Sequence, residues 1–115
     1  MSQRTRKVII SLLTWQLVNG YERLIEVAEK IGDLIIIGNG DTSEYALRAI
    51  VSLRGLSENE VVVIKGRGEF IEKAIDVYNE MKARMGESLK LVKVNIGSER
   101  VGRRIFPYIE IKVKI

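Results

Sequence analysis

Two basic residues and two glycines connect an apolar run to a helix-like segment in the middle of the chain. Residues 61–64, Val-Val-Val-Ile, have the pattern of a short strand that is covered on both faces. Residues 65–68 read Lys-Gly-Arg-Gly, and from Glu69 onward the apolar residues recur at helical spacing. Such a turn can hold a phosphate group, because the first backbone N–H groups of a helix are unpaired. The alternative is that both glycines only permit a tight connection.

The chain contains no cysteine and no histidine in its 115 residues. Disulfides, thiolate nucleophiles and cysteine-ligated metals are therefore excluded, and the usual general base is missing. The glycine turn also lacks the hydroxyl residue of a P-loop, and Ile71 stands where a dinucleotide-binding fingerprint needs its third glycine. The sequence predicts a protein that is not an enzyme, with no catalytic residues, metal site, cofactor or small-molecule substrate.

The formal net charge of +4 is distributed unevenly, with the basic residues at the two ends of the chain. Residues 1–7 carry a charge of +3, residues 8–64 have 4 basic against 8 acidic residues, and residues 65–115 have 12 basic against 7 acidic residues. This asymmetry favours a polyanionic partner, although a solvated basic face is an equally common explanation. Many charged residues and a single proline also fit a thermophilic protein.

The elements that must position the glycine turn follow from the periodicity of the sequence. Residues 34–37 form a second short apolar run, and a helix is expected from the N-cap Asp41, in a capping box with Glu44, to Gly55. After the strand at 61–64, a second helix ends near Gly86. Alternating residues at 90–96 and 109–115 then predict a hairpin. With right-handed crossovers, the sequence predicts an α+β fold of order βαβαββ, in which two helices cover one face of a four-stranded mixed sheet.

The first 32 residues are expected to form a separate N-terminal helical extension, followed by a compact domain of residues 33–115. Residues 21–31 have helical spacing, and Gly32 ends that helix; residues 8–18 fit a helix better than a strand. The apolar run of residues 8–18 is too short to span a bilayer, and no signal-peptide cleavage site follows it. We therefore expect a cytoplasmic protein with no membrane partner.

Residues 97–104, Gly-Ser-Glu-Arg-Val-Gly-Arg-Arg, are expected to form a basic loop at the tip of the hairpin. Its three arginines, Arg100, Arg103 and Arg104, can contact phosphate groups along a nucleic-acid groove. The alternative is a solvated loop without a partner.

Two aromatic residues follow this loop. Phe106 and Tyr108 share the alternation of the cations in the last strand, and aromatic rings exposed among cations can stack on unpaired bases. Pro107 between them cannot donate a ladder hydrogen bond, so it marks an edge or a bulge. A shift in register there could instead turn the rings toward the core or a dimer interface.

These elements resemble the Alba family of archaeal nucleic-acid-binding proteins. The resemblance covers residues 33–115 and rests on residues 34–38, 63–68, 71–76 and 92–97; Ile-Lys-Gly-Arg-Gly at 64–68 with Lys-Ala-Ile-Asp at 73–76 is its most specific part. It implies a homodimer, or a heterodimer with a related chain, that binds DNA or RNA with little sequence preference. It also implies kinship with chromatin proteins, which are nucleoid-associated, and with small ribonuclease P subunits.

The basic residues of this chain match the family to different degrees. Lys65 and Arg67 match the family's basic turn residue by residue. The hairpin arginines match only by lying in the same hairpin. The resemblance therefore implies nucleic-acid contact at the turn and the hairpin.

Two positions depart from the family pattern. The loop after the first strand, which carries a lysine pair in chromatin members, here reads Asn39-Gly40-Asp41, and Glu69 replaces a basic residue after the turn. These departures keep a second function open: a protein-binding subunit of a ribonucleoprotein or chromatin assembly with weakened nucleic-acid contact.

Overall fold

The computed structural model describes residues 30–115, and the helices predicted before residue 30 lie outside this range. The first described element is a strand, β1 (Lys30–Ile36), so the helix predicted to reach Ile31 and end at Gly32 is wrong over its last residues. Two tertiary contacts accompany the extended conformation. The Asp33 carboxylate accepts a 2.7 Å hydrogen bond from Ser52 Oγ, and Gly32, which has no side chain, leaves room for the side chain of Leu56. β1 thus begins three residues before the predicted start of the compact domain. The division into an extension and a domain stays a prediction.

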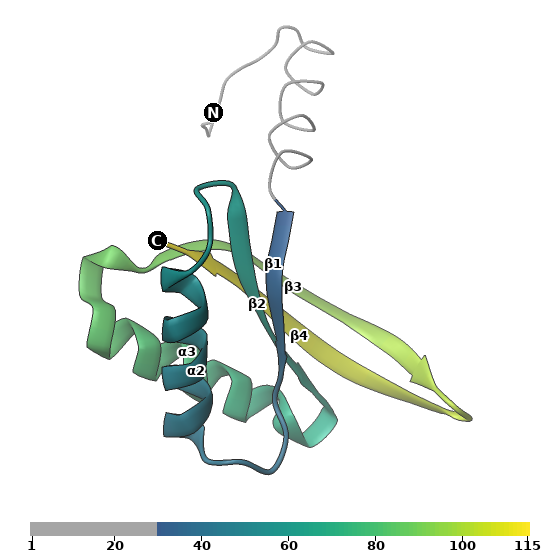
Figure 1. Cartoon of the computed structure of the whole chain (residues 1–115). Helices are drawn as coiled ribbons and strands as arrows, with labels where there is room; N and C mark the ends of the chain where they lie inside the picture. Colours follow the sequence, from purple (N-terminus) through teal and green to yellow (C-terminus); the bar gives the residue numbers. More distant parts are fainter. Residues whose placement is uncertain (1–29) are drawn as a thin grey trace, which may run out of the picture. The chain divides into compact units, whose positions relative to one another are not determined.

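The elements after β1 are α2 (Thr42–Arg54), β2 (Glu60–Arg67), α3 (Ile71–Met85), β3 (Lys90–Val101) and β4 (Arg104–Lys114), with 3₁₀ turns η1 (Gly68–Phe70) and η2 (Gly86–Ser88). They form a four-stranded sheet of order β1-β2-β4-β3. β4 is antiparallel to both β2 and β3, whereas β1 and β2 run in the same direction, and both helices lie on one face (Figure 1). The predicted βαβαββ fold with a mixed sheet is confirmed.

β2 is the central strand that its apolar run predicts. All four residues from Val61 to Ile64 are buried, and Val62 and Ile64 belong to the core beneath the helices. Because side chains alternate along a strand, Lys65 and Arg67 point to the opposite side from Ile64. We call this side of the sheet, opposite α2 and α3, the open face. The other core residues are Ile35, Ile37, Ala46, Ala49, Ile50, Leu53, Ala74, Val77, Met81, Leu89, Ile109, Ile111 and Val113.

The hairpin is longer than predicted, and the predicted basic loop of residues 97–104 is wrong. β3 continues to Val101 and β4 begins at Arg104, which leaves only a two-residue turn of Gly102 and Arg103. Gly102 has a φ of +65°, which a tight hairpin turn requires at its first central residue and which glycine adopts without steric cost. The cross-strand pairs of β3 and β4 continue as far as Val101 and Arg104. The segment that was predicted as a loop is therefore almost entirely β-strand.

The outer half of the hairpin is a two-stranded ribbon that projects beyond the sheet (Figure 1). The pairing of β2 with β4 ends at Arg67 and Tyr108, whereas β3 and β4 stay paired as far as Val101 and Arg104. Pro107 lies just beyond the last β2 pair, where one side of β4 has no strand partner, so the edge interpretation of this proline is confirmed. The register shift in the hairpin lies instead at Leu91/Lys93.

The loop between β1 and α2 is organised by Tyr45 and Lys73. The Tyr45 hydroxyl accepts hydrogen bonds from the backbone N–H groups of Gly38 (2.9 Å) and Gly40 (3.3 Å). Lys73 Nζ donates to the Gly38 carbonyl at 2.8 Å. Asp41 is the N-cap of α2, but its side chain makes no capping hydrogen bond, so the predicted capping box is wrong. The loop therefore depends on side chains that reach it from both helices.

We expect Tyr45→Phe to lower the free energy of unfolding by about 0.5–1.5 kcal/mol, because it leaves two glycine N–H groups without their acceptor. Urea unfolding followed by circular dichroism measures this difference. Tyr78→Phe is the matched control, because the Tyr78 hydroxyl makes no hydrogen bond within residues 30–115. Equal stabilities of the two variants would contradict this role of Tyr45.

Neither α2 nor α3, nor any other helix within residues 30–115, is long and apolar enough to cross a membrane.

Candidate nucleic-acid interface

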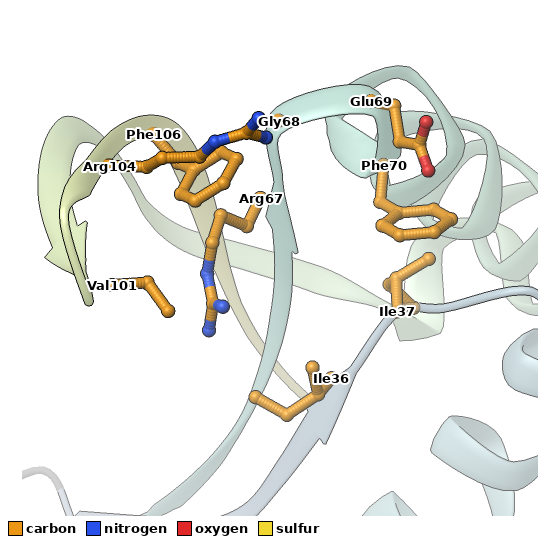
Figure 2. Close-up of a pocket in the computed structure, with 9 residues that line it drawn as sticks. All are labelled: Ile36, Ile37, Arg67, Gly68, Glu69, Phe70, Val101, Arg104 and Phe106. Atoms are coloured by element: carbon orange, nitrogen blue, oxygen red, sulfur yellow. The ribbon is translucent and has the colours of Figure 1, made fainter.

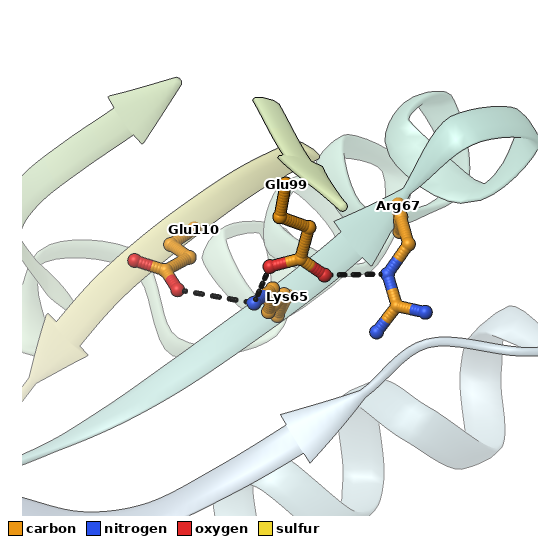
Figure 3. Close-up of polar contacts among 4 residues, drawn as sticks. All are labelled: Lys65, Arg67, Glu99 and Glu110. Carbon is orange, nitrogen blue, oxygen red and sulfur yellow. Dashed lines mark hydrogen bonds and ion pairs between the residues drawn. The ribbon is translucent and has the colours of Figure 1, made fainter. Parts of the chain in front are cut away.

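The open face brings together charged residues from three strands at the end where β1 and β2 finish. Directly opposed residues of antiparallel strands share a face, and Lys65 is opposite Glu110 while Arg67 is opposite Tyr108. On the other side of β4, Glu99 of β3 is opposite Phe106. Lys65, Arg67, Glu99 and Glu110 form what we call the charge cluster (Figure 3).

Glu99 is the centre of the charge cluster. One carboxylate oxygen accepts a 2.8 Å hydrogen bond from Lys65 Nζ, and the other lies 2.7 Å from Arg67 Nε. Lys65 Nζ is also 3.6 Å from a carboxylate oxygen of Glu110. One acidic side chain therefore partly neutralises both cations that the sequence assigns to nucleic-acid contact.

The two cations differ in their access to solvent. The side chain of Lys65 is 16% exposed and that of Arg67 is 37% exposed. Lys65 Nζ also lies 4.8 Å from the centroid of the Tyr108 ring, close enough for a cation–π contact. The terminal nitrogens of Arg67 point away from Glu99 (Figure 3). Arg67 is thus the better placed of the two for an incoming phosphate.

The ion pairs of the charge cluster shift the pKa values of two groups. The hydrogen bond from Lys65, with the charges of Lys65 and Arg67, holds the pKa of Glu99 below its ordinary value of 4.5. The hydrogen bond to Glu99 raises the pKa of Lys65 above 10.5, against a smaller opposing effect of burial. Glu99 and Lys65 therefore both stay charged at neutral pH, and their ion pair persists under physiological conditions.

These shifts predict how stability depends on pH. Because the pKa of Glu99 is lowered in the folded state, its ion pairs stabilise the fold above pH 4.5, and this stability is lost as the pH falls through the folded-state pKa. Because the pKa of Lys65 is raised, its ion pairs stabilise the fold below pH 10.5, and this stability is lost as the pH rises through the folded-state pKa. We expect the unfolding free energy of wild type minus that of Glu99→Gln to be constant from about pH 6 to 9 and to shrink below 4.5. Urea titrations across this range measure the difference. A difference that persists unchanged to about pH 2 would contradict the ion-pair explanation.

The two glycines of the basic turn have structural roles. A Cβ at Gly66 would collide with the backbone oxygen of Phe70, so the glycine permits close packing of β2 against the start of α3. Gly68 has a φ of +60°, which favours glycine. The tight-connection interpretation of both glycines therefore holds. α3 itself begins at Ile71, after η1, and not at Glu69 as the sequence predicted.

Tyr108 and Phe106 both point to the open face but have different surroundings. The Tyr108 ring lies across Gly97 of β3, where a Cβ would be 2.7 Å from the hydroxyl oxygen, and it also lies next to Lys65. Phe106 is half-buried, and its ring edge is in contact range of Gly68. Tyr108 therefore contacts the charge cluster through Lys65, whereas Phe106 lines a cavity.

That cavity has a volume of about 510 Å³ and lies between the ends of β1 and β2 and the ribbon (Figure 2). We call it the groove. Arg67 and Arg104 supply its positive charge, and Phe70 and Phe106 supply aromatic surface. Its remaining lining residues are Ile36, Ile37, Gly68, Glu69 and Val101.

The three predicted hairpin arginines are all exposed but do not act from one place. Arg104 is opposite Val101 and lines the groove on the open face. Arg100 is opposite Ile105, the pair next to Val101 and Arg104. Because side chains alternate along a strand, Arg100 points to the other face of the ribbon. Arg103 lies in the turn itself. The ribbon therefore presents cations on both faces and at its tip.

Glu99 is the residue at the centre of the charge cluster that sequence reasoning missed. It lies in a segment that was predicted as a loop, where its side chain had no defined direction. The signal for its position was the alternation Gly97, Glu99, Val101 along an extended β3, which places its carboxylate on the same face as Tyr108. Within residues 30–115 no three His, Cys, Asp or Glu side chains are grouped in a way that could hold a metal ion.

The sequence and the fold both match known proteins. The family profile of Alba matches residues 33–98. DNA/RNA-binding protein Alba 2 of Saccharolobus solfataricus is 36% identical over 89 residues, which cover 76% of this chain and 97% of that protein. DNA/RNA-binding protein Alba of Methanococcus maripaludis is 28% identical over 69 residues, or 60% of this chain and 76% of that protein.

Two solved structures share the fold. Alba from Thermoplasma volcanium superposes with a TM-score of 0.62 at 23% identity, over 71% of this chain and 99% of that one. ALBA1 from Trypanosoma brucei also gives a TM-score of 0.62, at 17% identity over 75% of this chain and 71% of that one. Since the family profile matches more than half of its residues and a relative is 36% identical over three quarters of them, this chain belongs to the Alba family.

Proposed function

We propose that this chain is an Alba-type protein that binds the phosphate backbone of DNA or RNA with little sequence preference. The observation that carries the proposal is the position of its arginines: Arg67 and Arg104 line one groove, and Arg100 and Arg103 lie exposed on the adjoining ribbon. Guanidinium groups bind phosphate oxygens in a bidentate way. The names of the relatives, DNA/RNA-binding proteins Alba and Alba 2, support the same partner.

We further propose that the protein acts as a dimer, either with itself or with a related chain. The support is an apolar stripe on the helix-side face of β3, where Leu91, Val94 and Ile96 are exposed although the opposing residues of β4 are buried. Water disfavours such a stripe, and a second chain could cover it. Light scattering should give twice the monomer mass of 13.0 kDa; a monomer at micromolar concentration would overturn the dimer.

The proposal includes no enzymatic activity, cofactor or small-molecule substrate, as family membership supports. We place the protein in the cytoplasm, at the nucleoid if its partner is chromosomal DNA.

Binding titrations at two or more salt concentrations test this function on duplex DNA, duplex RNA and single strands. A dimer that uses two or three cations per protomer would neutralise about 4 to 6 phosphates, so log K against log salt should have a slope of roughly −4 to −5 on duplex DNA. Unrelated duplex sequences should give similar affinities. Absence of binding on every substrate at low salt would contradict the proposal.

The second candidate is a protein-binding subunit of a ribonucleoprotein or chromatin assembly. Two observations favour it: Glu99 partly neutralises Lys65 and Arg67, and the loop at Asn39, Gly40 and Asp41 contains no cation. This candidate predicts weak binding to all free nucleic acids, so the same titrations separate the two functions.

A further inference from the structure

We propose that the groove binds one unpaired nucleobase together with its neighbouring phosphate, so that single-stranded segments are preferred over continuous duplex. This inference deepens the proposed function and rests on it. Exposed arginines can contact the phosphate backbone without a cavity. The groove would bind a different part of the nucleic acid, a single unpaired nucleotide.

The size and lining of the groove fit a nucleotide. Its volume of about 510 Å³ lies in the range of roughly 300–1,000 Å³ that is typical of small-ligand sites. Arg67 and Arg104 can bind a phosphate, and Phe106, Val101 and Ile36 give the same cavity apolar walls. A site for phosphate alone would not need these walls, because a phosphate cannot use apolar contact. A base that carries a phosphate uses both parts of the lining.

Phe106 is placed to be the stacking surface. Its ring edge packs next to Gly68 at the end of β2, within 3.4 Å of where a Cβ of that residue would lie. The ring is half-buried, so part of it remains open to the groove, and Arg104 lies beside it on the same strand (Figure 2). Fixed aromatic rings next to cations are the usual stacking surfaces for unpaired bases. In a duplex the bases stay paired inside the helix and cannot reach this ring.

Glu69 also lines the groove, next to Phe70, and adds a negative charge at the edge away from the two arginines (Figure 2). A carboxylate repels a row of phosphates but can accept hydrogen bonds from the N–H groups of a base. This combination again fits a single nucleotide better than a continuous backbone.

The experiment measures the affinity of the full-length protein for a single-stranded oligonucleotide and for an oligomer of the same length and charge with abasic sites. Each stacked base contributes roughly 5- to 150-fold in affinity, so the intact strand should bind at least about 5-fold more tightly. A fluorescent 2-aminopurine base in the strand should be quenched on binding. RNA and DNA versions of the strand show whether the 2′-hydroxyl matters.

Variants of Phe106 assign the effect to the groove. Phe106→Ala should lower the ratio of single-strand to duplex affinity by about 5- to 150-fold. Phe106→Leu, which keeps apolar packing on Gly68, should lose most of this ratio, and Phe106→Tyr should keep it. Ile115→Ala is the control, an exposed apolar residue after the other end of β4, and should bind like wild type.

Two outcomes would overturn the inference while leaving the proposed function in place: equal affinity of wild type for intact and abasic strands, or an unchanged ratio in both Phe106→Ala and Phe106→Leu. If wild type binds neither duplex nor single strand at low salt, the proposed function itself fails. Each result therefore decides a different statement.

Discussion

Replacing Arg100, Arg103 and Arg104 together by alanine is expected to lower the affinity for duplex DNA near 0.1 M salt by up to about 500-fold for each protomer engaged. Each phosphate contact adds about 0.9 to the salt slope, which corresponds to about 8-fold in affinity between 1 M and 0.1 M salt. If all three arginines contact phosphates, the slope should become flatter by about 2.7 for each protomer engaged. The loss should be similar on all sequences, because phosphate contacts carry no sequence information.

The fold should survive this triple substitution. All three side chains are exposed on a ribbon that lies beyond the last β2–β4 pair, and none belongs to the core. Titrations of binding against salt, with circular dichroism as the folding check, measure the two properties separately.

The matched control for the triple variant removes the same charge from the helices. Arg48, Arg54 and Arg84 are exposed on α2 and α3, on the side of the sheet opposite the groove. Their replacement by alanine should leave affinity nearly unchanged if the ribbon makes the contacts. Equal losses in both triple variants would mean that net charge alone drives binding. A hairpin variant that binds like wild type would favour the protein-binding function.

Glu99→Gln is expected to increase nucleic-acid affinity, by about 8-fold near 0.1 M salt for each phosphate contact that it frees. Its carboxylate now occupies Lys65 Nζ and Arg67 Nε and partly neutralises both cations. Glutamine has nearly the same shape without the charge, so it cannot compete with a phosphate for two cations. The salt slope should become steeper at the same time. A gain in affinity with an unchanged slope would contradict the release of phosphate-binding cations.

Glu80→Gln is the control for Glu99→Gln. It removes one negative charge and a 2.8 Å ion pair, that of Glu80 with Arg84, from α3 on the other side of the sheet. General reduction of negative charge would raise affinity in both variants alike. Release of the charge cluster would raise it in Glu99→Gln alone.

The structure also separates the predicted site residues into groups. Arg67, Arg104 and Phe106 line the groove, whereas Lys65 is engaged with Tyr108 and with Glu99. Arg100 and Arg103 lie on the rest of the ribbon. Nothing in the sequence distinguished Lys65 from Arg67 as phosphate contacts. Lys65 is less exposed than Arg67 because of the contacts that β3 and β4 make across the sheet.

The sequence by itself determined the order of elements and the place of the basic turn. Residues 61–64 are apolar without interruption, and the change to helical spacing after Gly68 is a pattern of neighbouring residues. The positions of Lys65 and Arg67 on one face of β2 follow from the period of a strand. These are properties of neighbouring residues, so no distant contact was needed to predict them.

Only the tertiary structure decided what happens between distant residues. Glu99 reaches Lys65 from 34 positions away because β4 lies between their strands, and the register of three strands fixes that meeting. Contacts with other elements decide three further features in the same way. They are the length of the hairpin, the start of β1 at Lys30, and the hydrogen bonds of Tyr45 to the loop between β1 and α2. Local propensity favours a loop around Gly97 and Gly102, but cross-strand pairing outweighs it, since each added pair of residues satisfies backbone groups that a loop would leave to water.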